Sequence, residues 1–265
     1  MTLPPSLLEN TIEAARNLEA AASQKVLRKP LQVVGLYCLV RHRQIAVAIQ
    51  RLGLESAYES RVLLRTMIEI YINYAWIRLR DTDLRAERFL KFVPLEKLRI
   101  LEQTTRAYRP DEYARLKRTR QTEREKVRHL FQSHDTKGKM KWAKSWTCGK
   151  SVEAMFTEIQ ENEKPETSLD LFLYGLYRFF SSAVHGGPLS RTEVLMVVDR
   201  RIIASPQPEH DPTEDHTVGA FTLLASSIEA FAEDAMLQDQ CHADIRKVSA
   251  ALQELMPRVP QLNVG

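Results

Sequence analysis

Apolar residues recur every three or four positions over most of the chain, which is the spacing of amphipathic helices. Proline, glycine or a capping residue separates each such stretch from the next. The stretch 55–80 is apolar nearly all round, so we expect it to lie at the centre of the fold. In chain order, the spacing predicts helices over residues 6–27, 31–51, 55–80, from 81 or 82 onward with a kink or split at Pro94, 111–132, 151–161, 213–238 and 242–256.

A different pattern marks one segment. The sequence "EVLMVVDRRIIA" carries a run of β-branched residues, which is typical of strands. It predicts one short β hairpin near residues 193–204, whereas residues 133–150 are expected to form a loop. The chain is therefore expected to be all-α, with an N-terminal helical extension (1–53) and a main helical domain (54–265) that together form one compact unit.

Composition limits the class of protein. Hydrophobic residues make up 44% of the 265 residues, which is enough for a substantial core. Three widely spaced cysteines without a CxxC motif indicate neither a disulfide framework nor a zinc knuckle, as expected in a reducing cytoplasm. The longest apolar runs fall short of the roughly 20 residues that a bilayer span needs. We therefore expect a soluble, cytoplasmic protein with no membrane partner.

Positive charge is concentrated in one stretch. Residues 106–150 hold fourteen Lys and Arg against five Asp and Glu, an excess of +9, whereas the whole chain carries +4. Aromatic residues lie among these charges, so the stretch could follow a phosphate backbone and offer stacking faces. A solvated helix face followed by a lysine-rich loop is the alternative. The candidate RNA-binding residues are Lys137, Lys139, Lys141, Lys144, Trp142 and Trp146.

The stretch "RFFSSAVHGGP" places Arg178 and His185 seven residues apart. In a helix this separation turns the chain by about 700°, which leaves both side chains within roughly 20° of one face and about 10 Å apart along the axis. Ser181 and Ser182 lie between them on that side. The glycines and the proline that follow end the helix, so the helix dipole favours a protonated His185. A phosphate could bridge Arg178 and His185.

An arginine followed four to six residues later by a histidine near a helix end, in an all-helical protein, resembles the signature of the HEPN superfamily. The segments "RVLLRTMIEIYINYAWI", "RAERFLKF", "WTCGKSVEAMF" and "YGLYRFFSSAVHGG" together are similar to an uncharacterised bacterial family of unknown function, over about residues 55–187. The resemblance implies a HEPN-like bundle, a homodimer, and metal-independent RNA cleavage in a toxin or anti-phage defence system, with a protein partner possible there. In that reaction His185 would accept a proton and Arg178 would stabilise charge at phosphorus.

Two other interpretations of the motif stay open. The fold could serve a non-catalytic module that binds RNA, a nucleotide or another protein. Alternatively, Arg178 could satisfy a buried carboxylate while His185 caps its helix. Arg65 and Glu69 are candidate supporting residues, because their spacing of four favours an ion pair and Glu69 could also neutralise or orient Arg178.

Metal and cofactor sites are weakly indicated. Cys38 and His42 have a helical ligand spacing but lack a second pair, so we interpret them as a core cysteine and a helix-surface histidine. The acidic segment 209–216 has no fixed ligand spacing and is interpreted as a flexible loop. The chain contains no GxxxxGK[ST], GxGxxG or GxSxG motif. We therefore expect neither a metal nor a cofactor.

Overall fold

A computed structural model of the chain gives an all-α fold, as predicted. Its helices are α1 (Pro5–Ser23), α2 (Pro30–Leu52), α3 (Ala57–Leu79), α4 (Thr82–Thr105), α5 (Pro110–Lys126), α6 (Arg128–Phe131), α7 (Val152–Asn162), α10 (Pro212–Ala235) and α11 (His242–Leu255). Its strands are β1 (Gln132–His134), β2 (Met140–Trp142), β3 (Leu195–Val198) and β4 (Arg201–Ala204). The structure describes residues 4–52, 56–134, 139–162, 177–178, 181, 195–198, 201–204 and 212–255.

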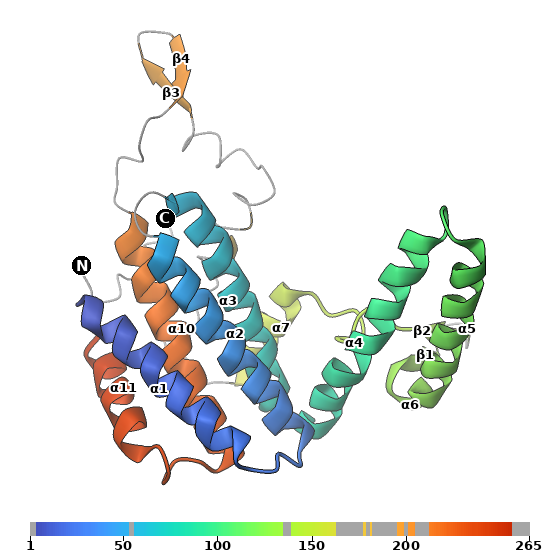
Figure 1. Cartoon of the computed structure of the whole chain (residues 1–265), viewed down its shortest axis with the longest axis horizontal. Helices are drawn as coiled ribbons and strands as arrows, with labels where there is room; N and C mark the ends of the chain where they lie inside the picture. Colours follow the sequence, from blue (N-terminus) through green and yellow to red (C-terminus); the bar gives the residue numbers. More distant parts are fainter. Residues whose placement is uncertain are drawn as a thin grey trace.

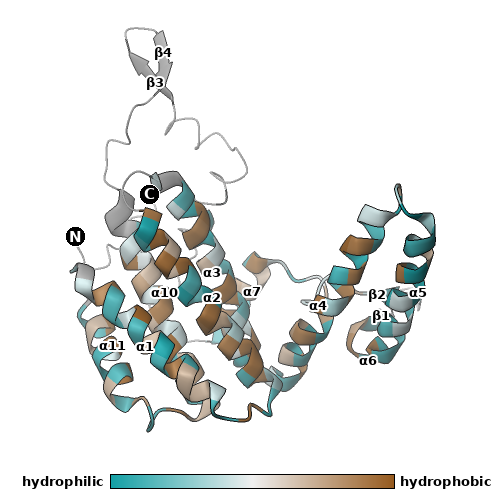
Figure 2. Cartoon of the chain, in the orientation of Figure 1, coloured by the Kyte–Doolittle hydropathy of each residue, from teal (hydrophilic) through white to brown (hydrophobic). Residues whose placement is uncertain are grey.

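The main part of the molecule is a bundle in which α1, α2, α3 and α10 run side by side, with α11 beside α1 (Figure 1). Helix α3 packs against α2, α10, α7 and α4, which confirms its predicted central position. Helix α10 is as deeply embedded, because it packs against α1, α2, α3 and α11. Apolar residues concentrate in this bundle, whereas α5 is hydrophilic (Figure 2).

The helices of residues 1–53 are part of the bundle. Leu18 of α1 and Leu39 of α2 are fully buried in the same core as Ile68 of α3 and Phe221 of α10. A close contact also joins α2 to its neighbours at Gly35. A Cβ atom there would lie 2.6 Å from the Tyr74 hydroxyl and 2.9 Å from Phe231, so only glycine allows this approach.

His42 corrects the sequence-based interpretation. Cys38 is a buried core residue, as expected, but His42 is also fully buried and does not lie on the helix surface. Its Nε2 lies 2.9 Å from the Met67 carbonyl oxygen and its Nδ1 lies 2.5 Å from Ser227 Oγ. Since a carbonyl only accepts, Nε2 carries the proton and Nδ1 accepts from the Ser227 hydroxyl. These partners make a buried imidazole tolerable.

Helix α4 leaves the bundle and carries a second lobe made of α5, α6, β1 and β2 (Figure 1). Of the kink or split predicted at Pro94, the split is absent, since α4 continues through this residue. A small separate core joins the lobe, formed by Leu95, Leu130 and Phe131 with Trp142 packed against it. The helix expected over 111–132 instead ends at residue 126, and a one-turn helix follows.

Two antiparallel hairpins complete the described fold. The predicted hairpin near 193–204 is confirmed as β3–β4, in which Met196 pairs with Ile203. Hairpin β1–β2 lies where the sequence indicated only a loop, and Ser133 pairs there with Lys141. Its strands span three residues each, too few for a detectable alternation of apolar and polar positions. Among the described helices, none combines the length and apolar character needed to cross a membrane.

Candidate nucleic-acid interface

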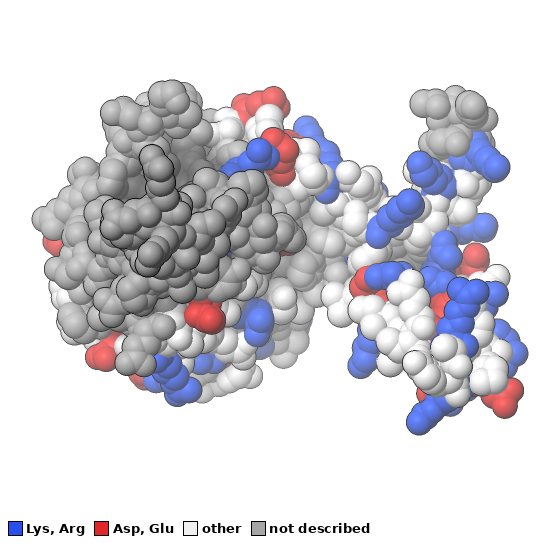
Figure 3. Space-filling model, turned by 90° about the horizontal axis from the view of Figure 1, so that it is seen from above, with Lys and Arg blue, Asp and Glu red and all other residues white. Residues whose placement is uncertain are grey.

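We define the basic arm as residues 92–144, which span the second half of α4, α5, α6 and hairpin β1–β2. Lys and Arg side chains gather over this lobe (Figure 3). Helix α5 begins at Pro110, and Asp111 and Glu112 in its first turn suit the positive end of the helix dipole. None of its residues is buried. The helix is held to α4 by an ion pair of 2.6 Å between Arg120 Nε and Glu102 Oε2.

Several cations of the arm have carboxylate partners three residues away. Glu112 lies 3.2 Å from Arg109 Nη1, and its other oxygen lies 3.8 Å from Arg115 Nη2. Lys126 Nζ lies 2.6 Å from Glu123 Oε1. Exposed pairs of this kind contribute little free energy, so a phosphate group could replace the carboxylate at small cost.

Other cations of the arm lack such partners. Lys117, Arg124, Lys141 and Lys144 form no ion pair with any residue in the described part of the chain. Arg124 instead lies over the indole of Trp142, with its Cζ 4.2 Å from the ring centroid. Burial lowers the pKa of the Arg124 guanidinium, and the neighbouring charge of Arg120 lowers it further. A bound anion would therefore stabilise the charged form of Arg124.

Two hollows lie beside Trp142, and both are lined by Arg120 and Arg124. The first, which we call the Lys144 hollow, has a volume of about 550 Å³ and includes Phe92, Leu95 and Lys144 in its lining. The second has a volume of about 430 Å³ and includes Lys117. The arm therefore combines uncompensated positive charge with concave, partly aromatic surfaces, which suits a polyanion that carries planar groups.

The predicted RNA-binding residues differ in where they lie and in how exposed they are. Lys139, Lys141 and Lys144 are exposed, while Lys137 lies outside the described residues. Trp142 is half-buried and lines both hollows. Trp146 belongs to the bundle instead, because its ring packs against those of Trp76 and Phe89 with centroids 5.6 and 5.1 Å away. We therefore leave Trp146 out of the interface.

Arg178 is on the surface, with 63% of its side chain exposed. Its Nη1 lies 3.5 Å from Oε1 of Glu153, which is itself 64% exposed. This geometry contradicts the interpretation in which Arg178 satisfies a buried carboxylate. The ion-pair partner of Arg178 is also not Glu69, the residue that the sequence suggested. His185 and Ser182 lie outside the described residues, so the predicted pairing of Arg178 with His185 stays a prediction.

Arg65 contacts two of the other predicted supporting residues, Ser181 and Glu69. Its Nε donates a hydrogen bond of 2.9 Å to Ser181 Oγ, and its guanidinium lies 5.3 Å from the centroid of the Tyr177 ring. The expected ion pair with Glu69 is present at 3.8 Å. Arg65 therefore ties α3 to Tyr177 and Ser181, the described residues on either side of Arg178.

Sequence reasoning missed a charged cluster at the joint between bundle and arm. The buried Glu158 of α7 accepts hydrogen bonds from Arg85 Nη2 at 2.7 Å, from Trp76 Nε1 at 2.9 Å and from Lys150. Arg80 lies 2.7 Å away. Burial alone would raise the pKa of Glu158, but the hydrogen bonds from Lys150, Trp76 and Arg85 outweigh it and hold the pKa well below its usual range. No local motif signals this cluster, because its members come from α3, α4, α7 and a loop.

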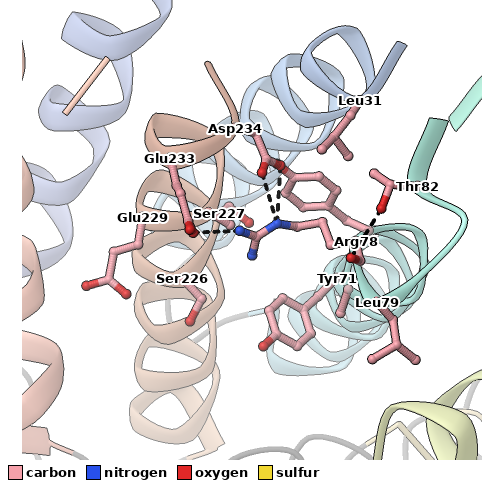
Figure 4. Close-up of a pocket in the computed structure, with 13 residues that line it drawn as sticks. Leu31, Tyr71, Arg78, Leu79, Thr82, Ser226, Ser227, Glu229, Glu233 and Asp234 are labelled. Carbon is pink, nitrogen blue, oxygen red and sulfur yellow. Dashed lines mark hydrogen bonds and ion pairs between the residues drawn. The ribbon is translucent and has the colours of Figure 1, made fainter. Parts of the chain in front are cut away.

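A cavity of about 510 Å³ lies between α3 and α10 (Figure 4). Arg78 points into it and lies 2.7 Å from Glu233 and 3.2 Å from Asp234. The Tyr74 hydroxyl donates a hydrogen bond of 2.5 Å to Asp234. Because these charges compensate one another, the described residues that line the cavity offer no free cation to an anionic ligand. The arm is therefore the stronger candidate for a functional surface.

Comparison with known proteins identifies a family whose function is unknown. Residues 32–200 match a family model described as "Family of unknown function (DUF5677)". No curated protein and no solved structure matches the chain. Among the described residues, no three His, Cys, Asp or Glu side chains gather where they could hold a metal ion.

Proposed function

The chain belongs to DUF5677, a family of unknown function, and we propose from its own residues that it binds RNA through the basic arm and cleaves it as a HEPN-like, metal-independent endoribonuclease. The observation that carries the proposal is the set of arm cations that have no carboxylate partner among the described residues. Four of them, Lys117, Arg124, Lys141 and Lys144, lie on one lobe together with a half-buried tryptophan.

Electrostatics favours a nucleic acid over a small anion as the ligand of the arm. Neutralising phosphates with Lys and Arg releases counterions from the nucleic acid, and the gain grows with the number of contacts. A single metabolite cannot reach all the exposed cations of α5 and the β1–β2 hairpin, whereas a strand of several nucleotides can. Exposed pairs such as Glu123 with Lys126 can also exchange a carboxylate for a phosphate.

The proposed cleavage uses the 2′-hydroxyl of the RNA as the nucleophile and the side chains of His185 and Arg178. His185 takes the proton of a 2′-hydroxyl, and that oxygen attacks the adjacent phosphorus. Arg178 stabilises the added negative charge, and the bond to the 5′-oxygen breaks to leave a 2′,3′-cyclic phosphate. The departing oxygen needs a proton, which a second His185 could donate in a homodimer that brings two motifs together. The exposure of Arg178 supports this role, because a phosphate can reach it.

Cleavage is tested by replacing Arg178 or His185 with alanine and incubating each variant with RNA in EDTA. We expect either change to slow cleavage at least about a hundredfold, the scale for losing a general base or a transition-state cation. The melting temperature of Arg178→Ala should stay close to that of the wild type, because Arg178 is exposed, and the melting temperature of His185→Ala verifies that this variant folds.

The matched controls are Arg246→Ala and His242→Ala, which remove an exposed arginine and an exposed histidine from α11. Both controls should cleave like the wild type. Equal rates in all five proteins, or an inactive wild type, would contradict the proposed chemistry.

A second function is favoured by the ion pair of Arg178 with Glu153, because a carboxylate that occupies the guanidinium competes with phosphate. In this case the protein is a non-catalytic helical module that binds RNA, a nucleotide or a protein partner. RNA binding by the wild type without any cleavage in EDTA would select this function.

A further inference from the structure

We propose that the Lys144 hollow holds one unstacked nucleotide of a single-stranded RNA, with the base against Trp142 and the phosphate on Arg124 and Lys144. This inference rests on the proposed binding of RNA by the arm and adds the kind of strand that is recognised. It makes the arm selective for single strands, because a base inside a duplex cannot enter a hollow.

The lining of the hollow has an apolar and a charged part. Phe92, Leu95, Trp142 and Ala143 supply an apolar and aromatic surface. Its volume of about 550 Å³ lies within the range of about 300–1,000 Å³ that is usual for small-ligand sites. This combination of an apolar, aromatic surface and enough room suits a nucleobase better than a phosphate alone.

Four cations and one carboxylate also line the hollow. Arg99 is paired with Glu96, whose oxygens lie 2.5 and 2.8 Å from its guanidinium nitrogens. Arg120 is paired with Glu102, which does not line the hollow. The two remaining cations are Arg124 and Lys144, which form no ion pair with any described residue. Two uncompensated charges at the edge of an apolar surface match the phosphate that accompanies a base.

Trp142 supplies the surface for the base, and Arg124 serves both parts of the nucleotide, because its guanidinium plane can face the base while its N–H groups bind the phosphate. The guanidinium lies over the indole, with its Cζ 4.2 Å from the ring centroid, and both groups border the hollow. Unpaired bases stack on indole rings and on guanidinium planes in complexes of proteins with single-stranded RNA. The small core of the arm fixes the indole, because Phe131 is fully buried and its ring centroid lies 6.0 Å from that of Trp142.

The test compares two exposed lysines, Lys141 in β2 and Lys144 just after it, of which one lines the hollow. Lys144 lines it, whereas Lys141, three residues away, is exposed and does not. Binding of a single-stranded RNA and of a duplex of the same length is measured for the wild type, Lys144→Ala, Lys141→Ala and Ala143→Trp. The tryptophan at 143 fills the hollow without changing the charge.

We expect Lys144→Ala and Ala143→Trp to weaken binding of the single strand by about tenfold, which is within the range for losing one stacked base with its contacts. Lys141→Ala should weaken binding of both RNAs by the same smaller factor, since it removes charge only. Duplex binding should be unchanged in Ala143→Trp. Melting temperatures verify that this variant folds, and the comparison of Lys144→Ala with Lys141→Ala does not depend on it.

The outcomes separate this inference from the proposed function. If Lys144→Ala and Lys141→Ala have equal effects on the single strand, the hollow is not the site, although the arm still binds RNA. The same conclusion follows if a folded Ala143→Trp variant binds like the wild type. If the wild type binds neither RNA, RNA binding by the arm is itself wrong.

Discussion

His42 sits where protonation is costly, because both of its ring nitrogens are used by Ser227 and Met67 inside the bundle. Burial lowers its pKa to about 4 in the folded protein, compared with about 6.5 in an unfolded chain. The sequence could identify Cys38 as a core residue from its apolar neighbours. It could not place His42, because Ser227 lies 185 residues away in the chain.

The depressed pKa of His42 predicts a loss of stability in mild acid. The unfolded chain binds a proton below about pH 6.5, whereas the folded protein does not until about pH 4, so the free energy of unfolding falls as the pH is lowered between these values. From pH 7 to pH 5 the loss from this residue is about 2 kcal/mol. Urea denaturation at both pH values should show a smaller difference for His42→Gln than for the wild type.

The control for this prediction is His242→Gln, at an exposed position of α11, which should keep the pH dependence of the wild type. A His42→Gln variant whose loss between pH 7 and pH 5 equals that of the wild type would contradict the assignment.

At the scale of elements, the bounds of most long helices could be predicted to within about four residues, because their apolar periodicity and their flanking breakers are local signals, whereas α5 ends six residues earlier than predicted. The hairpin β1–β2 and the joint between α3, α4 and α7 could not, because they depend on contacts between distant segments. Pro94 also shows the limit of a local rule, since α4 continues through it. Beyond Pro94, the helix packs against α5, where Glu102 pairs with Arg120.

The charged cluster at the joint between bundle and arm predicts that loss of the Glu158 carboxylate strongly lowers the stability of the fold. Replacing Glu158 with alanine leaves the guanidinium of Arg85, whose side chain is 5% exposed, buried without a carboxylate. This change should lower the free energy of unfolding by about 3–5 kcal/mol. Arg80→Ala is the control, because its side chain is 57% exposed and its ion pair with Glu158 should contribute about 1 kcal/mol or less. Similar denaturation midpoints for the two variants would refute this account of the joint.

At the scale of the whole molecule, the charge asymmetry could be read from the sequence, but its separation in space could not. Residues 106–150 were recognisable as basic, whereas the bundle and the arm were not recognisable as separate lobes. The separation arises because α4, with 24 residues, is about 36 Å long and extends past the bundle. Among the described elements, its far half packs against α5 and α6, and Leu95 shares the small core of the arm with Trp142 of β2. The basic residues therefore project away from the more acidic remainder of the chain.

RNA binding by the arm is the central claim, and its salt dependence is the most direct measure of it. Binding of a single-stranded RNA is titrated between about 50 and 200 mM salt for the wild type and for a variant with Lys137, Lys139, Lys141 and Lys144 all changed to alanine. A control variant removes four exposed cations from the bundle instead, at Lys29, Arg51, Arg246 and Lys247.

We expect the arm variant to bind more weakly and the slope of log K against log salt to become shallower by up to about 3, since each phosphate contact on a single strand contributes about 0.7. The control variant should keep the slope of the wild type. No RNA binding by the wild type at low salt, or equal slopes for the arm variant and the wild type, would contradict the claim.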